Sequence, residues 1–306
     1  MKKEEVNHHQ FDSIPAAHRF FGLPKPGHPL ISLISDQAVC GPPGAHVLHF
    51  YKISYKSKFS GKLRYGQHYY DFDGGGLLFA SPNQVIGGNN DDTINISEER
   101  PLYTLLIHPD FLWNYPLAKK IRQYGFFSYS ANEALHLSET EEATVISIFK
   151  MMEQELNSRI DDFSQDVIIA QIELLLNFAN RFYKRQFITR KAVNNDLLQK
   201  LEDLLDNYFN KETSLNDGLP TVQFLAARLN LSPNYLSDML RSLIGQNAQQ
   251  YIHSRLIEKA KEILSTTRLS VSEVAYTLGF EHPQSFSKLF KSKTNLSPLE
   301  FRRSFN

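Results

Sequence analysis

The same two-helix pattern occurs twice toward the C-terminal end of this 306-residue sequence. In the first copy, apolar residues recur at i, i+3, i+4 and i+7 from Val222, and a second apolar series begins at Leu236. Equivalent series begin at Val271 and Phe286, so the first helices are 49 residues apart and the second helices are 50 residues apart. The repeat predicts two helix-turn-helix units, at 221–243 and at 270–293.

Capping signals support these helix boundaries. Ser232 precedes Pro233, which is the arrangement typical of an N-cap followed by the first helical residue. Ser270 and Glu273 have the spacing of a capping box at the start of the second unit. His282 stands at the N-cap position of the last helix, where it is a poor cap. Ser232 and Ser270 therefore give two of the four helix starts a clear local explanation.

A longer helix is predicted between the two units. Ile252, Leu256 and Ala260 follow helical spacing within a segment from about Ala248 to Ser265. A helix of that length spans roughly 27 Å. Two-helix units of this kind place their second helix in the DNA major groove, and successive groove segments lie ~34 Å apart. The intervening helix is therefore long enough to hold two recognition helices about one DNA turn apart.

The polar faces of the two second helices are the candidate DNA-contacting surfaces. Asn and Gln side chains can pair with adenine edges, whereas Lys and Arg can pair with guanine or with phosphate. Asp238 is discordant, because its carboxylate would face a polyanion: either it accepts a hydrogen bond from cytosine N4, or the first copy contributes little base recognition. The alternative is a helical bundle with an ordinary solvated polar face, but matched caps in a duplicated unit favour DNA binding.

This stretch resembles the DNA-binding domain of the AraC/XylS transcriptional regulators, over roughly 196–306. The resemblance is carried by "LAARLNLSPNYLSDMLRSLIG" and by "RLIEKAKEILSTTRLSVSEVAYTLGFEHPQSFSKLFKSKTNLSPLEFR". It implies two subdomains joined by a long helix, each placing a recognition helix in the major groove. Asp238 and Asn295 depart from the family pattern, which more often has a basic or amide residue and a glycine there. The implied DNA-contacting residues are Asn234, Ser237, Asp238, Arg241, Pro283, Gln284, Ser287, Lys288 and Lys291.

Charge is balanced overall but uneven along the chain. The whole sequence has 33 basic and 33 acidic residues. From Gly218 to Asn306, eleven basic residues stand against six acidic ones. Such a modest local excess suits a specific regulator that makes few phosphate contacts.

Cysteine content and hydropathy exclude several classes of protein. Cys40 is the one cysteine, so an internal disulfide and a cysteine-rich zinc site are excluded, and a buried inert thiol is favoured over a redox sensor. No apolar run approaches 18 residues, and the N-terminal "MKKEEVNHHQ" lacks the apolar core of a signal peptide. We therefore expect a cytoplasmic protein without a membrane span.

The first half of the sequence predicts a β-rich domain. Short strand-like runs lie in "HVLHFYKISYK", "KLRYGQHYYDF", "GGLLFASPNQVI" and "PLYTLLIHPDF", separated by Gly, Pro, Asn and Asp clusters. This spacing suggests a small barrel or jelly roll at about 40–110. The family resemblance agrees, because many AraC-type regulators carry a cupin-like sensory barrel here. It rests on His46 and His49 before an aromatic strand, "LLFASPNQV" and "LLIHPDFL".

A metalloenzyme is the main alternative for this barrel, and the sequence argues against it. Metal-binding cupins need three or four clustered His and carboxylate ligands. His46 and His49 would point to opposite faces of one strand, and His68 and His108 are isolated. We predict no catalytic residues, no metal and no cofactor. An aromatic ligand cavity is preferred, although about half of its candidate residues must be core: Phe50, Tyr51, Tyr55, Tyr69 and Phe79.

Two helical segments follow the barrel at about 138–186. Ser138 and Glu141 form a predicted capping box at the start of the first. The second, at about 161–186, has an apolar stripe that either covers the barrel or forms a dimer seam. A polar linker is predicted at about 187–195, "FITRKAVNN". The residues of the stripe are Ile168, Ile172, Leu175, Leu176, Ala179 and Phe182.

Together these features predict an α+β protein with a cupin-like N-terminal domain (1–186) and an all-α AraC-type DNA-binding domain (196–306). We expect a sequence-specific transcription regulator and not an enzyme. Its expected partners are double-stranded promoter or operator DNA, a small-molecule effector, a second copy in a homodimer and, for an activator, RNA polymerase. The alternatives are a cupin-type metalloenzyme that the C-terminal half targets to DNA, and a constitutive DNA-binding protein without an effector.

Overall fold

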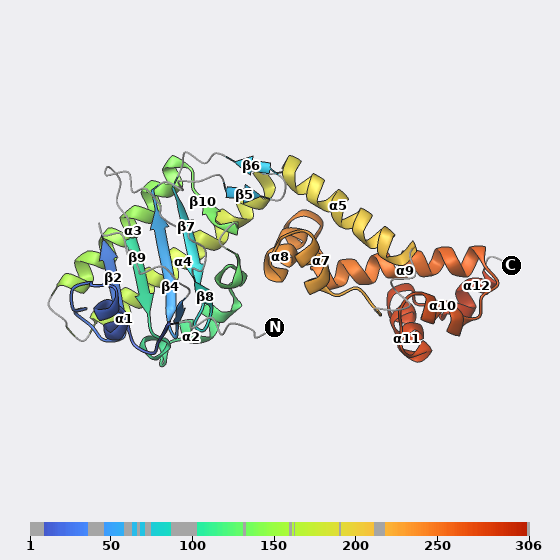
Figure 1. The fold of residues 1–306 in the computed structure, drawn as a ribbon, viewed down its shortest axis with the longest axis horizontal. Coiled ribbons are helices and arrows are strands. Elements are labelled where there is room, and N and C mark those ends of the chain that lie inside the picture. The colour runs from blue at the N-terminus through green and yellow to red at the C-terminus, as the bar shows by residue number, and fades with distance from the viewer. Residues whose placement is uncertain are drawn as a thin grey trace, which may run out of the picture. The chain divides into compact units, whose positions relative to one another are not determined.

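The computed structural model describes residues 9–35, 46–57, 63–65, 68–70, 75–86, 103–130, 133–158, 161, 163–189, 191–210 and 218–304. The chain divides into two compact units, Met1–Gln186 and Phe187–Asn306 (Figure 1). The first combines β-sheets with helices, and the described part of the second is helical. The fold class is therefore α+β, as the sequence predicts. No described helix combines the length and the hydropathy that a membrane span requires.

A five-stranded antiparallel sheet is the centre of the first unit. The strand order is β10-β7-β4-β9-β2. Its two outer strands lie outside the predicted range of about 40–110, because β2 ends at Ser35 and β10 begins at Leu135. The strands are β2 (Ile31–Ser35), β4 (Tyr51–Lys56), β7 (Gly76–Ala80), β9 (Tyr103–Ile107) and β10 (Leu135–His136).

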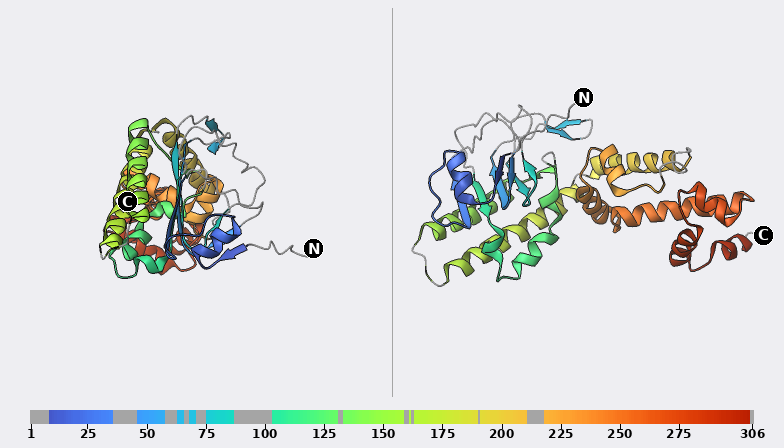
Figure 2. Two further views of the ribbon diagram at one scale, coloured as in Figure 1. Left: turned by 90° about the vertical axis from the view of Figure 1, so that its left-hand side faces the viewer. Right: turned by 60° about the horizontal axis from the view of Figure 1, so that its bottom comes forward.

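Helices cover one face of this sheet, as the edge-on view in Figure 2 shows. They are α3 (Glu139–Asn157) and α4 (Ser164–Thr189). The ring of Tyr103 stacks on that of Phe149 in α3 at 5.1 Å, and the Tyr55 hydroxyl donates to Glu142 Oε1 at 2.5 Å. Tyr55 and Tyr103 are opposite each other in the β4–β9 register, so alternate residues of both strands face α3 and α4.

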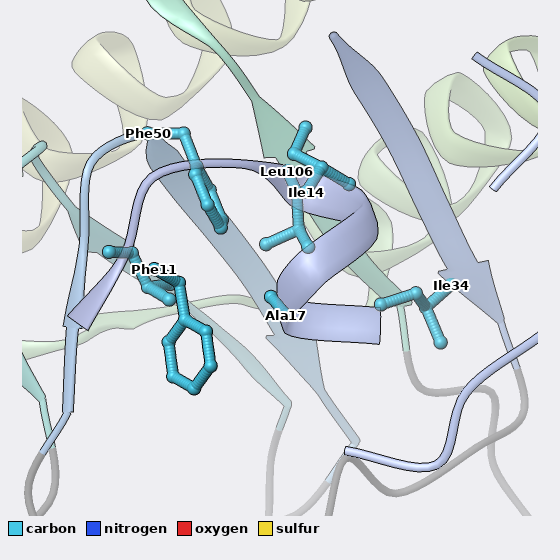
Figure 3. Packing of buried hydrophobic residues seen from close by; sticks show 7 residues of the cluster. Phe11, Ile14, Ala17, Ile34, Phe50 and Leu106 are labelled. Atoms are coloured by element: carbon cyan, nitrogen blue, oxygen red, sulfur yellow. The ribbon is translucent and has the colours of Figure 1, made fainter. Parts of the chain in front are cut away.

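The short helix α1 (Ile14–Phe20) packs on the opposite face of the sheet (Figure 3). The Ser13 side chain accepts a hydrogen bond from Ala16 N and caps this helix. Ile14 and Ala17 of α1 contact a buried cluster that includes Phe50 and Leu106. All five residues of β9 are buried, because apolar layers cover both faces of the central sheet.

Smaller elements complete the first unit. β1 (His9–Phe11) pairs in parallel with β3 (His46–Leu48), which pairs with β8 (Val85–Ile86), and β5 (Leu63–Tyr65) pairs with β6 (His68–Tyr70). The four strand-like runs of the sequence therefore all contain strands. The short helices between β9 and β10 are η1 (Pro109–Leu112), α2 (Leu117–Lys120), η2 (Ile121–Gln123) and η3 (Gly125–Ser128).

The apolar stripe of α4 belongs to the core of the first unit, which corrects the dimer-seam alternative. Leu175 and its stripe neighbours are all buried within the single chain. The stripe faces the sheet layer, where Tyr183 of α4 packs against Phe79 of β7 at 6.3 Å. An apolar stripe predicts only that one face of a helix is buried, and here that face is buried against the sheet. The predicted capping box of Ser138 and Glu141 at the start of α3 is confirmed.

The described residues of the predicted polar linker at 187–195 belong to two helices. α4 ends at Thr189 and α5 (Lys191–Asn210) begins at Lys191. Phe187 and Asn194 are both buried, and Asn194 Nδ2 donates a hydrogen bond to the Phe187 carbonyl oxygen at 2.5 Å. One of the two asparagines that suggested a linker is thus a buried packing residue that ties the two helices together.

The second unit is built around the long helix α9 (Ala248–Thr266). Among the described residues, two short helices precede α9 and three follow it (Figure 1). Both α5 and α9 contribute to one contact, in which the Tyr251 hydroxyl donates to Glu202 Oε1 at 3.0 Å. The short helices described in this unit are α7 (Val222–Arg228), α8 (Pro233–Ile244), α10 (Val271–Thr277), α11 (Pro283–Thr294) and α12 (Pro298–Arg303).

Candidate nucleic-acid interface

Helices α7 and α8 form the first helix-turn-helix unit. The Thr221 and Ser232 side chains accept hydrogen bonds from the third backbone N–H beyond them, at 3.1 and 3.2 Å, and cap the two helices. Asn230 takes a left-handed conformation with φ 56° in the turn, which asparagine tolerates better than most residues. Gly245 ends α8 with φ 73°. Both ends of the candidate recognition helix are therefore fixed by local interactions.

Helices α10 and α11 form the second unit with one difference in the turn. Ser270 and Glu273 make both hydrogen bonds of the predicted capping box. The turn residue with positive φ is Gly279 at 90°, and His282 makes no side-chain capping bond. Four residues (229–232) separate the helices of the first unit and five (278–282) separate those of the second. This extra turn residue accounts for repeat offsets of 49 and 50.

Buried rings hold each recognition helix in place. Tyr235 in α8 is fully buried and packs edge-to-face against Phe187 at 5.1 Å. Phe286 and Phe290 in α11 are also fully buried, and Phe290 contacts Phe301 of α12 at 5.4 Å. The apolar pattern predicted that the two phenylalanines are buried. It did not predict the burial of Tyr235, because the ring that packs against it, Phe187, is distant in the sequence. Each helix is therefore fixed through one face.

The opposite faces carry the nine predicted DNA-contacting residues. Four of them lie on α8 and five on α11, in both cases beginning in the first helical turn. Their side chains are either exposed or half-buried. The exposed ones are Asn234, Arg241, Gln284, Lys288 and Lys291, and the half-buried ones are Ser237, Asp238, Pro283 and Ser287.

The two faces differ in charge. On α8, Arg241 Nη1 and Asp238 Oδ1 form an ion pair at 2.6 Å, so the only basic and the only acidic residue of this helix neutralise each other. Helix α11 carries Lys288, Lys291 and Lys293 and no acidic residue. Among the ion pairs of the described residues, none involves these three lysines. Helix α11 thus presents the stronger attraction for a polyanion.

Ion pairs also connect α9 with its neighbours. Arg255 of α9 donates to Asp206 of α5 at 3.2 Å and to Glu258 one turn along at 3.1 Å. Burial of Tyr251 and its hydrogen bond to Glu202 raise the pKa of its hydroxyl, so the neutral phenol remains the donor at physiological pH. At the other end of α9, Arg302 Nε donates to the Leu264 carbonyl oxygen at 3.2 Å. The first half of α9 is therefore anchored to α5 and its C-terminal end to α12.

Comparison with known proteins places this geometry in a family. Residues 225–304 match the family described as a helix-turn-helix domain. The arabinose operon regulatory protein of Escherichia coli is 37% identical over 78 residues, which cover 26% of this chain and 27% of that protein. The C-terminal unit contains an AraC-type helix-turn-helix domain. The HTH-type transcriptional regulator YisR of Bacillus subtilis is 30% identical over 99 residues, and 32% of each chain is covered.

Among solved structures, one that is similar in sequence is also the C-terminal part of a larger protein. The C-terminal domain of the two-component response regulator yesN from Fusobacterium nucleatum is 33% identical, with a TM-score of 0.29. The match covers 33% of this chain and 96% of that one. Against the curated relatives named above, the chain spans about a third or less of their length.

The predicted ligand-binding aromatics lie elsewhere in the first unit. Phe50, Tyr51, Tyr55 and Phe79 are all buried. Tyr51, Tyr55 and Phe79 pack among other rings on the α3–α4 side of the sheet, and Phe50 belongs to the cluster under α1. Tyr69 is part of β6, and its side chain lies outside the described residues, as does Cys40. A cavity of about 50 Å³ lies between α1 and the strands beneath it, and none of the four described aromatics lines it.

Proposed function

We propose that this protein is a sequence-specific DNA-binding transcription regulator that inserts α8 and α11 into successive major-groove segments. The observation that carries the proposal is the pair of capped helix-turn-helix units at the two ends of α9. The 19 residues of α9 span about 28 Å, close to the ~34 Å of one DNA turn. The nine predicted contact residues on α8 and α11 are the proposed DNA contacts, and the family match supports this role.

The first unit is the proposed sensory part. We assign residues 1–186 to a cupin-like domain that binds a small-molecule effector, and residues 196–306 to the DNA-binding domain, with 187–195 joining them. The division into two compact units at Gln186 supports this assignment. A homodimer acting on DNA in the cytoplasm, with RNA polymerase as a further partner if the protein activates transcription, completes the proposal. The buried stripe of α4 is not available as the dimer surface.

Footprinting of the full chain on a selected binding site tests the proposal. We expect each subunit to protect two major-groove segments on one DNA face, about 10 base pairs apart. Gln284→Ala with Lys288→Ala should remove one segment and weaken specific binding by about 1–3 kcal/mol for each residue. The matched variant on α8, Asn234→Ala with Ser237→Ala, should affect only the other segment. A single protected segment that survives the α11 double variant would contradict the two-helix proposal.

The Asp238–Arg241 pair gives a separate prediction. Asp238→Asn removes a negative charge from the DNA-facing side of α8 and releases Arg241, so affinity at low salt should rise. The slope of log K against log salt should steepen by about one unit, as for one added phosphate contact. Asp206→Asn is the matched control, because it breaks another Asp–Arg pair of the same domain outside α8 and α11. An unchanged slope with a loss of preference at one cytosine would instead assign base recognition to the carboxylate.

A further inference from the structure

The boundary between the two compact units falls inside a helix. α4 extends from Ser164 to Thr189, and the units divide between Gln186 and Phe187. The side chains of these two residues are 1% and 3% exposed, so both are core positions. Consecutive residues of an α-helix point about 100° apart, so they can pack in different directions. One turn of α4 therefore carries a core residue of each unit.

Gln186 binds the free edge of the sheet in the first unit. Its Oε1 accepts a hydrogen bond from His136 N at 2.8 Å, and its Nε2 donates to the Ala134 carbonyl oxygen at 3.2 Å. Arg185 Nη2 donates to the His136 carbonyl oxygen at 2.8 Å. β10 is the last strand in the sheet order, so its outer edge needs partners for these backbone groups. The end of α4 supplies them as a neighbouring strand would.

Phe187 contacts the first turn of the recognition helix α8 in the second unit. Its ring packs edge-to-face on that of Tyr235 at 5.1 Å. Tyr235 N donates to the N-cap Ser232 Oγ at 3.2 Å, and Asn234, a proposed DNA contact, is the residue before it. The Phe187 carbonyl oxygen accepts a hydrogen bond from Asn194 Nδ2, which fixes the main chain beside the ring. A displacement of Phe187 would therefore move the end of α8 where the DNA contacts begin.

The second helix-turn-helix unit differs at the position of this contact. With the 50-residue offset, Tyr235 corresponds to Ser285 in α11, whose side chain is exposed. Helix α11 is held instead by the buried rings of Phe286 and Phe290. A buried ring in the first turn is therefore not a requirement of the helix-turn-helix fold. The pair of Phe187 and Tyr235 connects the end of α4 with α8 through a position that α11 leaves exposed.

We propose that Phe187 is a positioning residue for DNA recognition, through which the packing of α4 on β10 regulates the fit of α8 and leaves that of α11 unchanged. The proposal rests on the proposed function and gives a route for its regulation. Any event in the first unit that changes how Gln186 binds β10 would change the position of Phe187, and with it the affinity of α8 for its groove segment. The lysines of α11 would still attract DNA, so the change would act on specific recognition.

Gln186→Met tests the route from the first unit. Methionine keeps the side-chain length and removes both hydrogen bonds to β10, without changing a residue of α8. The quantity to measure for the full chain is the loss of affinity when the α8 or the α11 segment of the binding site is scrambled. We expect the loss at the α8 segment to shrink by about threefold to tenfold and that at the α11 segment to stay within about twofold of wild type. Gln165→Met is the matched control, since Gln165 Nε2 donates to the Phe111 carbonyl oxygen at 2.9 Å near the other end of α4.

Phe187→Leu tests the contact with α8 itself. It should also reduce discrimination at the α8 segment alone, whereas Phe178→Leu, which changes a ring of α4 packed on Phe182, should not. The double variant Gln186→Met with Phe187→Leu should lose no more than Phe187→Leu, because Gln186 acts through Phe187. Amide hydrogen exchange should become faster in the first turn of α8 in both single variants and stay unchanged in the first turn of α11.

Equal losses at both segments, or additive losses in the double variant, would overturn the proposal. If Gln186→Met does not fold, Arg185→Met replaces it with the same expected result, because it removes the hydrogen bond to His136 from a half-buried position. A wild-type footprint with only one segment would contradict the proposed function. Two protected segments with wild-type discrimination at the α8 segment in every variant would contradict only the route through Phe187.

Discussion

Replacing Leu175 by glutamate should unfold the N-terminal unit instead of dissociating a dimer. Leu175 is fully buried in the single chain, on the face of α4 that packs toward the sheet. A buried carboxylate without a partner costs several kcal/mol, and the lost leucine packing adds about 2–5 kcal/mol. The stability of a domain is about 5–15 kcal/mol in total, so the substitution removes most of it. Circular dichroism melting of the full chain should show the loss of one transition.

Leu174 provides a matched control one residue away. Its side chain is 41% exposed on the other side of α4, so Leu174→Glu places the same charge in solvent. This variant should keep the wild-type melting profile to within about 0.5 kcal/mol. If the Leu175→Glu chain remained folded but sedimented as a monomer, the stripe would instead form the dimer interface.

Glu258→Pro should separate the two helix-turn-helix units in function. Glu258 lies in the middle of α9 with an exposed side chain, so the change acts on the helix backbone. A proline there removes a backbone hydrogen bond and clashes with the preceding turn, which costs ~3 kcal/mol and kinks the helix. Once α9 no longer fixes their spacing, the second unit loses its high effective concentration at the neighbouring groove. Specific affinity should fall by about a hundredfold.

Glu258→Ala separates the backbone effect from the ion pair with Arg255. That pair is exposed at Glu258, so its loss should change stability and DNA affinity only slightly. Melting of both variants by circular dichroism should accompany the binding assay, to establish that each retains helical structure. Wild-type affinity and a two-segment footprint in Glu258→Pro would mean that α9 does not set the spacing of the units.

Local interactions explain why the C-terminal unit was predictable. Ser232, Ser270 and Glu273 cap helices through neighbours three residues away, so their roles are visible in the sequence. Gly245 and Asn295 end α8 and α11 with positive φ for the same local reason. The 49- and 50-residue offsets then fix the order of helices, because each short amphipathic pair must bury its stripe against the long helix between them.

Long-range partners explain what the sequence could not predict. The apolar stripe of α4 predicts that one face of the helix is buried, but it does not identify the surface that buries it. Only the fold shows that this surface is the sheet. In β4, Tyr51 and Tyr55 point to one face of the sheet and Lys52 points to the other. The aromatic side chains suggested a ligand site, but in the structure they fill the core. The cavity lies on the other face of the sheet, where Lys52 and Thr104 point. His18 lines the cavity from α1. The N-cap Ser13 followed by Pro15 is a sequence signal that could have predicted the start of this helix.

The charge difference between α8 and α11 has a kinetic consequence. Diffusional encounter with DNA is accelerated by exposed positive charge, and α11 has three lysines where α8 has a self-neutralised pair. Helix α11 should therefore make the first productive contact and dominate the association rate, largely without regard to sequence. Helix α8 would dock afterwards, when the bound α11 already holds it close to the adjacent major-groove segment. Its fit would then govern how long the complex lasts, and so which sites are occupied.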